Sequence, residues 1–569
     1  MKNQTLVDLI IERPLYVITP LMSFLLISRL MMAWVNILSW DEAVYFLMAT
    51  DFPQSLAYTE FYYRPPGYPF LLFIFGLPCA FHPLVLHLVN LFLYICGNYF
   101  LFLLVKELED ETVARAAVIV AFLSPALMFL MGLSVMSESL FWLLSNSAMY
   151  FYVLFLRSEK IQHLVSSVVL WVFCSLTRFN TPFLIIILVL IPFYLRVDLR
   201  GICRRNFVKG VITLAISLLF TIPYLIHSYF TLGDIFSPFK AYSGAGFESK
   251  ELLSPIYLNT LLFQMIYVCL SLAGVFVLHF YRQLFRREHL FYWFWFFSQF
   301  ILVILFRPNF VGYGGVGGGN LARLIVAGFA PAFLIIGKSV VETKHVWVNP
   351  ILKRKISGII QIFSGIGIVI ILLINKNHGG NTQILWVMEM FVGLLLLDRF
   401  WAGVMWCMNR LNDKEGWSNN IHISINQIHH YSCYLKLILL ILVVSLSLAN
   451  SVHTITHSPY LSSVKSGSDY LKDQEMSYLY SKPYIMSNTI ILSYYLGYEN
   501  VHYKIPSTEG EFFKKVRDEN LSFVFIHRGG LSWPTFISEN SSYLTPVWNS
   551  QYEQAVIYAI DVSILTEIR

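Results

Sequence analysis

Apolar stretches separated by short polar loops recur along the first 451 residues. Because a helix needs roughly 20 apolar residues to cross a bilayer, these stretches predict about thirteen transmembrane helices. The predicted spans are 15–38, 84–105, 114–133, 138–156, 162–177, 181–196, 207–230, 256–280, 290–306, 321–338, 357–374, 383–403 and 434–451. The first is too long for the apolar core of a signal peptide and lacks a cleavage site after it, so we expect it to stay in the protein.

One apolar segment is too short for a span. Residues 68–83, YPFLLFIFGLPCAFHP, hold about 15 apolar residues between bracketing prolines. A segment of this kind is typical of a helix that lies in the membrane interface. We therefore expect it to end the first external loop, at about 39–83, without crossing the bilayer.

Lys and Arg residues gather in alternate loops. The densest cluster holds Arg196, Arg200, Arg204, Arg205 and Lys209, whereas the intervening loops hold few cations. Loops rich in Lys and Arg face the cytoplasm, so this asymmetry predicts a cytoplasmic N-terminus in the cell inner (plasma) membrane. It places the first external loop and the tail on the extracytoplasmic side.

The tail lacks long apolar stretches. KPYIMSN, NVHYKI, LSFVFIH and EQAVIYAID have patterns typical of strands, whereas SDYLKDQEMSYLY, TIILSYYLGY and EGEFFKKVRDE have patterns typical of helices. This alternation predicts a small α/β domain. The expected fold is a polytopic α-helical membrane protein, with a transmembrane module at 1–451 and an extracytoplasmic α/β domain at 452–569.

Composition agrees with a membrane protein. Of the 569 residues, 57% are hydrophobic and 13% are charged, and the mean hydropathy is +0.62. Soluble proteins carry about 25% charged residues. The formal charge of +6 is small for this length, and the sequence has no nucleic-acid signature. The seven cysteines show no spacing typical of a zinc site or a disulfide framework.

The first concentrated charge lies at the edge of the first span. Asp41 and Glu42 come after the apolar run, and Tyr45, Glu60 and Arg64 follow. Carboxylates near lipid are costly unless they are used or paired, so adjacent acids favour a general base at the membrane surface. A polar cap that ends a transmembrane helix would also place acids here.

Four stretches resemble motifs of one superfamily of membrane enzymes, the GT-C glycosyltransferases. DEAVY at 41–45 is similar to the D-E-x-x-Y motif of their first external loop, and YYRPPGYP at 62–69 to the turn that follows. SPALMFLMGLSVMSESLFWLLSNSAMYFY at 124–152 resembles their third and fourth spans, and IMSNTIILSYYLGY at 485–498 resembles part of their external tail. These enzymes use polyprenyl-phosphate sugars and include the aminoarabinose transferases of lipid A and the protein O-mannosyltransferases.

The resemblance implies roles for the acids of the first loop. Asp41 would be the base that takes a proton from an acceptor hydroxyl. Glu42 and Glu60 would orient the acceptor or a metal ion, with Mg or Mn as the candidate divalent cation.

Further residues are assigned to the site by the same resemblance. Glu138 would join the acids that orient the acceptor or a metal, and Tyr45 and Tyr68 would support the site. The sequence leaves a structural role for Glu138 open, because an acid beside Ser137 at the start of a span also caps the helix and complements its dipole.

Four arginines lie at predicted span ends on the external side: Arg64, Arg178, Arg307 and Arg323. Guanidinium groups bind phosphate oxygens bidentately, and a lipid phosphate gains charge as it leaves. We expect at least one of them to bind the donor phosphate, and we favour Arg64 because the following prolines fix its position. Contacts with lipid headgroups would also explain any single arginine. The superfamily often has an acidic residue and Lys in place of Tyr63 and Arg64, which leaves the donor sugar and the acceptor open.

The sequence therefore predicts a GT-C-type membrane glycosyltransferase, a hexosyl- or pentosyltransferase. It would move a sugar from a polyprenyl-phosphate donor to a lipopolysaccharide, glycolipid, polysaccharide or protein by inverting displacement, as in lipopolysaccharide biosynthesis. The rival prediction is a transporter or flippase of a lipid-linked saccharide, which would also need external arginines in an apolar bundle. Transporters usually contain two related halves, and the sequence shows none.

Overall fold

The structure, a computed structural model, describes residues 11–35, 40–57, 64–124, 127–179, 181, 185–197, 199–235, 289–306, 326–343, 459–477, 484–489, 491–496, 500–519, 521–527, 534–538, 543–550 and 555–561. Contacts divide the chain into two units. The first comprises Met1–Arg29, Tyr62–Tyr68 and Leu88–Ser451, and the second comprises Leu30–Phe61, Pro69–His87 and Val452–Arg569. Each unit is described by itself below.

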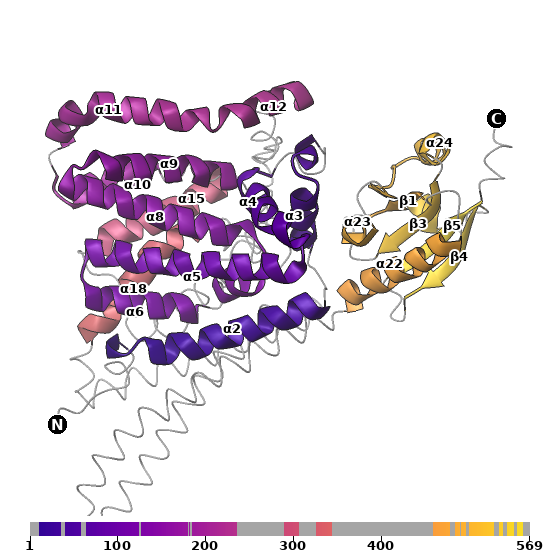
Figure 1. Ribbon diagram of the computed structural model, residues 1–569, viewed down its shortest axis with the longest axis horizontal. Coiled ribbons are helices and arrows are strands. Elements are labelled where there is room, and N and C mark those ends of the chain that lie inside the picture. Colours follow the sequence, from indigo (N-terminus) through magenta and orange to yellow (C-terminus); the bar gives the residue numbers. More distant parts are fainter. Residues whose placement is uncertain are drawn as a thin grey trace, which may run out of the picture. The chain divides into compact units, whose positions relative to one another are not determined.

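The helices of the first unit come from stretches predicted as spans. They are most of α2 (Leu15–Val35) and of α5 (Pro83–Leu108), with α6 (Glu111–Leu123), α8 (Ser137–Ser158), α9 (Ile161–Thr177), α10 (Ile185–Tyr194), α11 (Leu199–Leu219), α12 (Ile222–Leu232), α15 (Leu290–Phe306) and α18 (Phe329–Thr343). Helix α9 packs against both α8 and α11, and α18 packs against both α6 and α15 (Figure 1).

Three of the described helices, α2, α5 and α8, are long and apolar enough to cross a membrane. The pair α11 and α12 would add a fourth span if the two helices cross together. The total of about thirteen spans stays a prediction. The predicted spans 256–280, 357–374, 383–403 and 434–451 lie outside the described residues.

Two predicted spans each form two helical segments, and in both the interruption lies next to a proline. The 207–230 stretch forms α11 and α12, which bend by 42°. Pro223 lies at the start of α12, where it has no N–H to donate back into α11. The 114–133 stretch ends its α-helix at Leu123, and η3 (Met128–Leu133), a turn of wider π-helix, comes next among the described helices. Ser124 precedes a proline and is extended, with ψ 117°, because residues before proline avoid the helical region.

The loop at about 39–83, which we predicted to be external, contains short helices. Helix α3 (Trp40–Thr50) is followed by η1 (Gln54–Ala57), α4 (Gly67–Gly76) and η2 (Leu77–Cys79). The last two form the apolar segment that we predicted to lie in the interface. Ala80 and Phe81 have left-handed φ values of 49° and 54°, and a left-handed residue commonly ends a helix. The segment is therefore helical but shorter than a span.

A five-stranded sheet in the order β2-β1-β3-β5-β4 lies in the tail. Its strands are β1 (Tyr484–Ser487), β2 (Val501–Tyr503), β3 (Leu521–His527), β4 (Leu544–Asn549) and β5 (Ala555–Ile560). Strand β1 pairs in parallel with β2 and β3, whereas β5 pairs antiparallel with β3 and β4. The described helices are α22 (Pro459–Ser477), α23 (Ile491–Leu496), α24 (Glu509–Glu519) and α25 (Thr535–Ser538).

All the strands and helices that we predicted in the tail are present. The structure also contains a strand that we did not predict, β4. Pro546 interrupts its strand pattern, and proline is tolerated because β4 lies at the edge of the sheet. Phe512 and Val516 of α24 pack with Met486 and Val524 in the core. The boundary at 452 stays a prediction, because residues 344–458 lie outside the described part of the chain.

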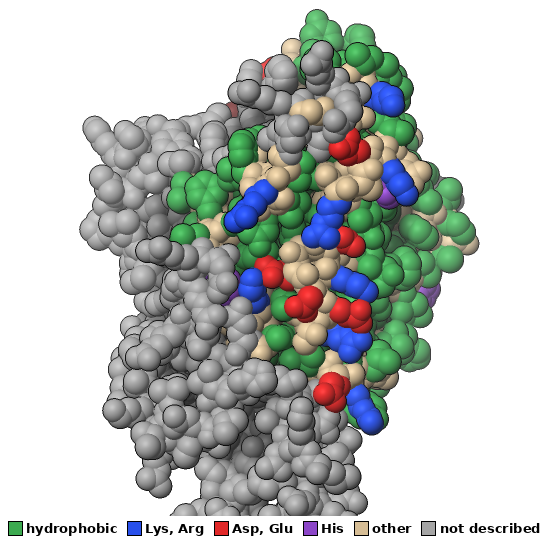
Figure 2. Space-filling view, turned by 90° about the vertical axis from the view of Figure 1, so that its left-hand side faces the viewer, with side chains coloured by type: hydrophobic (Ala, Val, Ile, Leu, Met, Phe, Trp, Pro, Cys, Tyr) green, Lys and Arg blue, Asp and Glu red, His purple; other side chains and the backbone are tan. Residues whose placement is uncertain are grey.

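Charged side chains gather on one face of the described residues. Figure 2 shows Lys, Arg, Asp and Glu side chains mixed on this face and bordered by apolar side chains. Lys106, Arg115 and Arg157 belong to two further loops that the Lys and Arg asymmetry predicts to be cytoplasmic. Lys106 and Arg115 pair with Glu111, and Arg157 pairs with Glu107. The sidedness of these loops stays a prediction.

Candidate functional site

A buried ion pair joins the start of α8 to the end of α9. Arg178 Nη1 lies 2.7 Å from Glu138 Oε1, and the two side chains expose 8% and 0% of their surface. Glu138 lies in the first turn of α8, and Arg178 directly follows α9, so each charge complements the dipole of its own helix. The structure thus brings together two of the predicted site residues.

Neighbouring groups complete the surroundings of this pair. Arg178 Nη1 donates to Ser137 Oγ at 3.5 Å, and the Ser137 hydroxyl donates to Glu138 Oε2 at the same distance. The Arg178 Cζ lies 5.8 Å from the ring centroid of Phe141, which is within cation–π range. Removing either charge would take from the other, which stays buried, its ion-pair partner at 2.7 Å. Each side chain is therefore held in one position by the other.

The turn that carries Arg64 contacts the same end of α9. Arg64, Pro65 and Pro66 are buried, and Gly67 begins α4. A Cβ atom at Gly67 would lie 2.7 Å from the Leu176 carbonyl oxygen and 3.0 Å from Thr177 Oγ1, so only glycine allows this approach. Because Thr177 immediately precedes Arg178, the turn of Arg64 lies against the helix end that positions Arg178.

Tyr68 connects this turn to α5. Its hydroxyl donates to Asn90 Oδ1 at 2.8 Å, and both side chains are fully buried. Asn90 Nδ2 donates in turn to the carbonyl oxygens of Met131 at 2.9 Å and Ser134 at 2.7 Å. Tyr68 was predicted from the family resemblance, whereas Asn90 was missed. The available signal was an amide within a largely apolar span, which also contains Asn98.

Arg29 is a second residue that the sequence analysis missed. It lies within α2 and is fully buried. Its Nη2 donates to the carbonyl oxygens of Met131 and Ser134, both at 3.0 Å, and its Nε donates to that of Gly132. A cation inside an apolar span is costly and marks a specific role, and that is the signal that could have identified it.

The acids of the first external loop lie on α3, in the second unit. Asp41 and Glu42 are in the first turn of the helix, where carboxylates complement the helix dipole. Glu42 and Tyr45 are buried, and Asp41 is partly exposed. The partial exposure of Asp41 is compatible with either role considered for it, helix cap or base.

A tail helix packs beside the helix of the acids. Helix α23 contacts α3, with the ring centroids of Phe46 and Tyr494 5.8 Å apart. Phe46 also meets His87 edge-on, at 6.2 Å. Tyr494 belongs to the tail stretch 485–498 that resembles the superfamily. The sequence did not predict that this stretch contacts α3.

Glu60, Arg307 and Arg323 lie outside the described residues, so the structure does not test their predicted positions. Among the residues that it does describe, no group of three or more His, Cys, Asp or Glu side chains could hold a metal ion.

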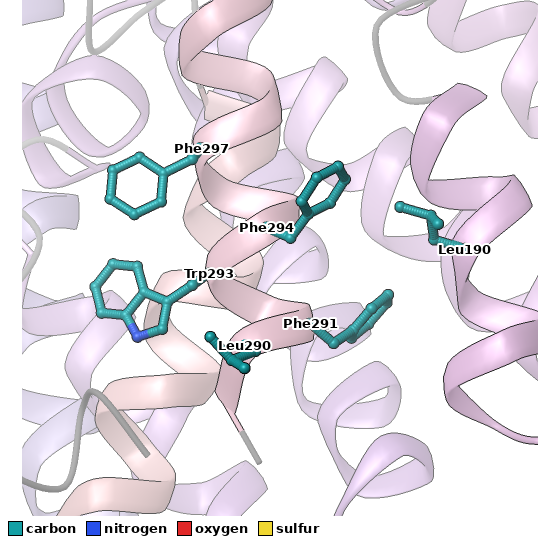
Figure 3. Close-up of a pocket in the computed structure, with 6 residues that line it drawn as sticks. All are labelled: Leu190, Leu290, Phe291, Trp293, Phe294 and Phe297. Carbon is teal, nitrogen blue, oxygen red and sulfur yellow. The ribbon is translucent and has the colours of Figure 1, made fainter. Parts of the chain in front are cut away.

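A hollow of about 620 Å³ lies between α10 and α15. It is lined by Leu190 of α10 and by Leu290, Phe291, Trp293, Phe294 and Phe297 of α15. In Figure 3, Phe291 and Phe294 point toward Leu190, whereas Trp293 and Phe297 point to the opposite side of α15. Nearly all of its lining is apolar, and none of its residues was predicted to take part in chemistry. It does not contribute to the candidate site.

The fold is shared with a solved membrane protein. No protein-family model matches the sequence, and no curated protein matches it. The crystal structure of ArnT from Cupriavidus metallidurans in the apo state matches with a TM-score of 0.56 and 12% identity, over 95% of this chain and 98% of that chain. ArnT from the same organism bound to undecaprenyl phosphate matches with a TM-score of 0.55, the same identity and the same coverage.

A weaker match is the oligosaccharyltransferase AglB from Archaeoglobus fulgidus, in complex with an inhibitory peptide and a dolichol-phosphate. Its TM-score is 0.37 at 11% identity, with 89% of this chain and 69% of that chain covered. The ArnT match extends along nearly the whole of both chains and includes the tail. The resemblance that the motifs predicted is thereby confirmed as a likeness of fold to ArnT.

Proposed function

We propose that the protein is a membrane glycosyltransferase that moves a sugar from a polyprenyl-phosphate donor to an extracytoplasmic acceptor. The observation that carries this proposal is the similarity of fold to ArnT over 95% of this chain. ArnT has been solved with undecaprenyl phosphate bound, which is a polyprenyl phosphate. The acids of DEAVY and the buried arginines are residue types that such a reaction needs.

The proposed reaction is a displacement at the anomeric carbon of the donor sugar. The acceptor oxygen forms a bond to that carbon while the bond from the carbon to the phosphate oxygen breaks, with inversion of configuration. Asp41 takes the proton of the acceptor hydroxyl, and the lipid phosphate leaves with the electron pair. A positioned general base contributes typically 10²–10⁴-fold to such a reaction.

The leaving phosphate requires positive charge. Arg64 binds it bidentately in this proposal, supported by the buried proline turn that holds its backbone. Arg178 adds positive charge nearby, because the turn of Arg64 contacts the end of α9. Its pairing with Glu138 keeps the guanidinium oriented before the donor arrives. Arg307 and Arg323 are further candidates for the same phosphate.

The remaining predicted residues act on the acceptor side. Glu42 and Glu60 orient the acceptor, or hold a divalent cation such as Mg or Mn, which would draw electron density from an oxygen bound to it. Tyr45 supports the acids as a buried neighbour on α3. The acceptor itself is a lipopolysaccharide, another glycolipid, a polysaccharide or a protein, at the external face of the plasma membrane.

Mass spectrometry of envelope glycans tests this proposal directly. Cells with and without the protein are compared, and the strain that lacks it is complemented with the wild type and with the Asp41→Asn variant. We expect one sugar increment to disappear from a lipid, polysaccharide or protein fraction. It should return with the wild type only, while the polyprenyl-phosphate sugar accumulates in its absence.

Two outcomes would contradict the proposal. Unchanged glycan masses in every fraction would remove the transferase. Movement of a lipid-linked saccharide across vesicles that contain the purified protein, with no new glycosidic bond, would instead identify a transporter.

A further inference from the structure

Two buried polar side chains bind the same short piece of backbone. Arg29 of α2 and Asn90 of α5 both donate to the carbonyl oxygens of Met131 and Ser134, at distances between 2.7 and 3.0 Å. Arg29 also donates to the carbonyl oxygen of Gly132. Three helical segments that are distant in sequence therefore meet at residues 131–134.

This piece of backbone needs donors because it lies at a helix break. Helix η3 ends at Leu133, and α8 begins at Ser137, so the last carbonyls of η3 lack the partners of a continuing helix. Met131 and Ser134 are buried in the protein, where no bulk water replaces these partners, and a buried carbonyl left without a donor is costly. Guanidinium and amide donors are well suited to this task, because each has more than one N–H.

The break leads directly into both parts of the arginine site. Ser134 is followed, after two residues, by Ser137 and Glu138, the partners of Arg178. On the other side, Asn90 accepts the hydroxyl of Tyr68 at 2.8 Å, four residues after Arg64. A connected set of hydrogen bonds thus runs from Tyr68 through Asn90 to the backbone at 131–134. The Ser139 hydroxyl of α8 donates to the same Met131 carbonyl oxygen at 3.4 Å.

We propose that Arg29 and Asn90 are positioning residues that fix the Arg64 turn relative to the Glu138–Arg178 pair, and so set the geometry in which the donor phosphate is bound. The proposal rests on the proposed function for its ligand, a polyprenyl phosphate. Neither residue touches the donor in this scheme; each acts through the backbone at 131–134 or through Tyr68.

The most selective test removes a single hydroxyl. Tyr68→Phe deletes the hydrogen bond to Asn90, and Tyr152→Phe is its matched control. The Tyr152 hydroxyl donates to the Leu188 carbonyl oxygen, also at 2.8 Å, between α8 and α10. Both variants lose one oxygen atom and one hydrogen bond of the same length, but only Tyr68 belongs to the proposed set.

The first readout is the affinity for undecaprenyl phosphate in detergent micelles, measured by intrinsic tryptophan fluorescence. We expect Tyr68→Phe to raise the Kd about three- to ten-fold, the range of one net hydrogen bond, with Tyr152→Phe within twofold of the wild type. Asn90→Leu should weaken binding further. Adding Tyr68→Phe to Asn90→Leu should have no extra effect, because both changes break the same connection.

The second readout is hydrogen exchange, which requires neither donor nor turnover. Asn90→Leu and Arg29→Lys should speed exchange in residues 131–138. Asn90→Leu should also speed it at Arg64, Gly67 and Tyr68, the residues of 64–69 that carry an amide hydrogen. Arg29→Lys keeps the charge but loses the planar fork of donors, so a partial effect is expected.

Additive effects of Tyr68→Phe and Asn90→Leu on affinity would overturn the proposal, as would an equal loss in Tyr152→Phe or unchanged exchange in residues 64–69. If the wild type binds undecaprenyl phosphate but transfers no sugar, the proposed function fails while both readouts still decide the positioning role. If it does not bind this lipid, the exchange measurement alone decides.

Discussion

The buried pair of Arg178 and Glu138 gives the sharpest energetic prediction. At a separation of 2.7 Å, the attraction of two unit charges is about 6 kcal/mol for an effective dielectric constant of about 20. Desolvation of both ions offsets much of this attraction, but removal of one partner typically costs 3–5 kcal/mol, because the remaining charge stays buried. Glu138→Gln and Arg178→Met should each destabilise the protein by about that amount.

The double variant separates the pair from its two members. Glu138→Gln combined with Arg178→Met leaves no buried charge at this position, so its loss of stability should be well below the sum of the single losses. The coupling is measured from thermal or denaturant unfolding of purified protein in detergent, followed by intrinsic fluorescence. Arg115→Met is the control, since the Arg115–Glu111 pair is exposed to solvent and should contribute little to stability.

Measurements of sugar transfer test whether the Arg178–Glu138 pair also takes part in binding the donor phosphate. If Arg178 contributes charge to the phosphate, Arg178→Met should lose sugar transfer even at temperatures where it remains folded. Additive losses of stability in the double variant would refute the energetic reasoning and would mean that the two groups do not depend on each other. Full transfer by a folded Arg178→Met protein would limit the pair to a structural role.

Three further outcomes are expected. Asp41→Asn should keep the protein folded and able to bind undecaprenyl phosphate while transfer falls by 10²–10⁴-fold, and full activity would remove Asp41 as the base. Arg64→Lys should lose roughly 1–3 kcal/mol of transition-state stabilisation in kcat/KM measurements, because Lys cannot bind a phosphate bidentately. Wild-type turnover in that variant would mean that Arg64 does not bind the donor phosphate and only contacts lipid headgroups. A reporter fused at residue 500 should give an extracytoplasmic signal, and a cytoplasmic signal would reverse the predicted topology.

The sequence by itself determined most of the local structure. Apolar length located α2, α5, α8 and α15, and alternation in the tail located most strands of the sheet, because both depend on repeats along the chain. The local sequence did not predict the effect of proline, which breaks a helix in one place and is tolerated in a strand in another. Pro223 bends a predicted span between α11 and α12, whereas Pro546 is accommodated in β4 at the edge of the sheet.

The candidate site was only partly determined by sequence. The family resemblance selected Glu138 and Tyr68, and position at an external span end selected Arg64 and Arg178. Neither signal indicated which of these residues meet. The ion pair joins residues 40 positions apart, and Arg29 binds carbonyls more than 100 positions away.

Those meetings depend on how helices pack, on the close approach that Gly67 allows against α9, and on the break between η3 and α8 that exposes carbonyl oxygens. The sequence around a hydrogen-bond donor in an apolar helix does not indicate which acceptor the donor will bind. Helices α2 and α5 meet at the same helix break only in the tertiary structure, and there Arg29 and Asn90 bind the same backbone carbonyls. The sequence could not determine this, because a buried hydrogen bond forms wherever packing places its acceptor.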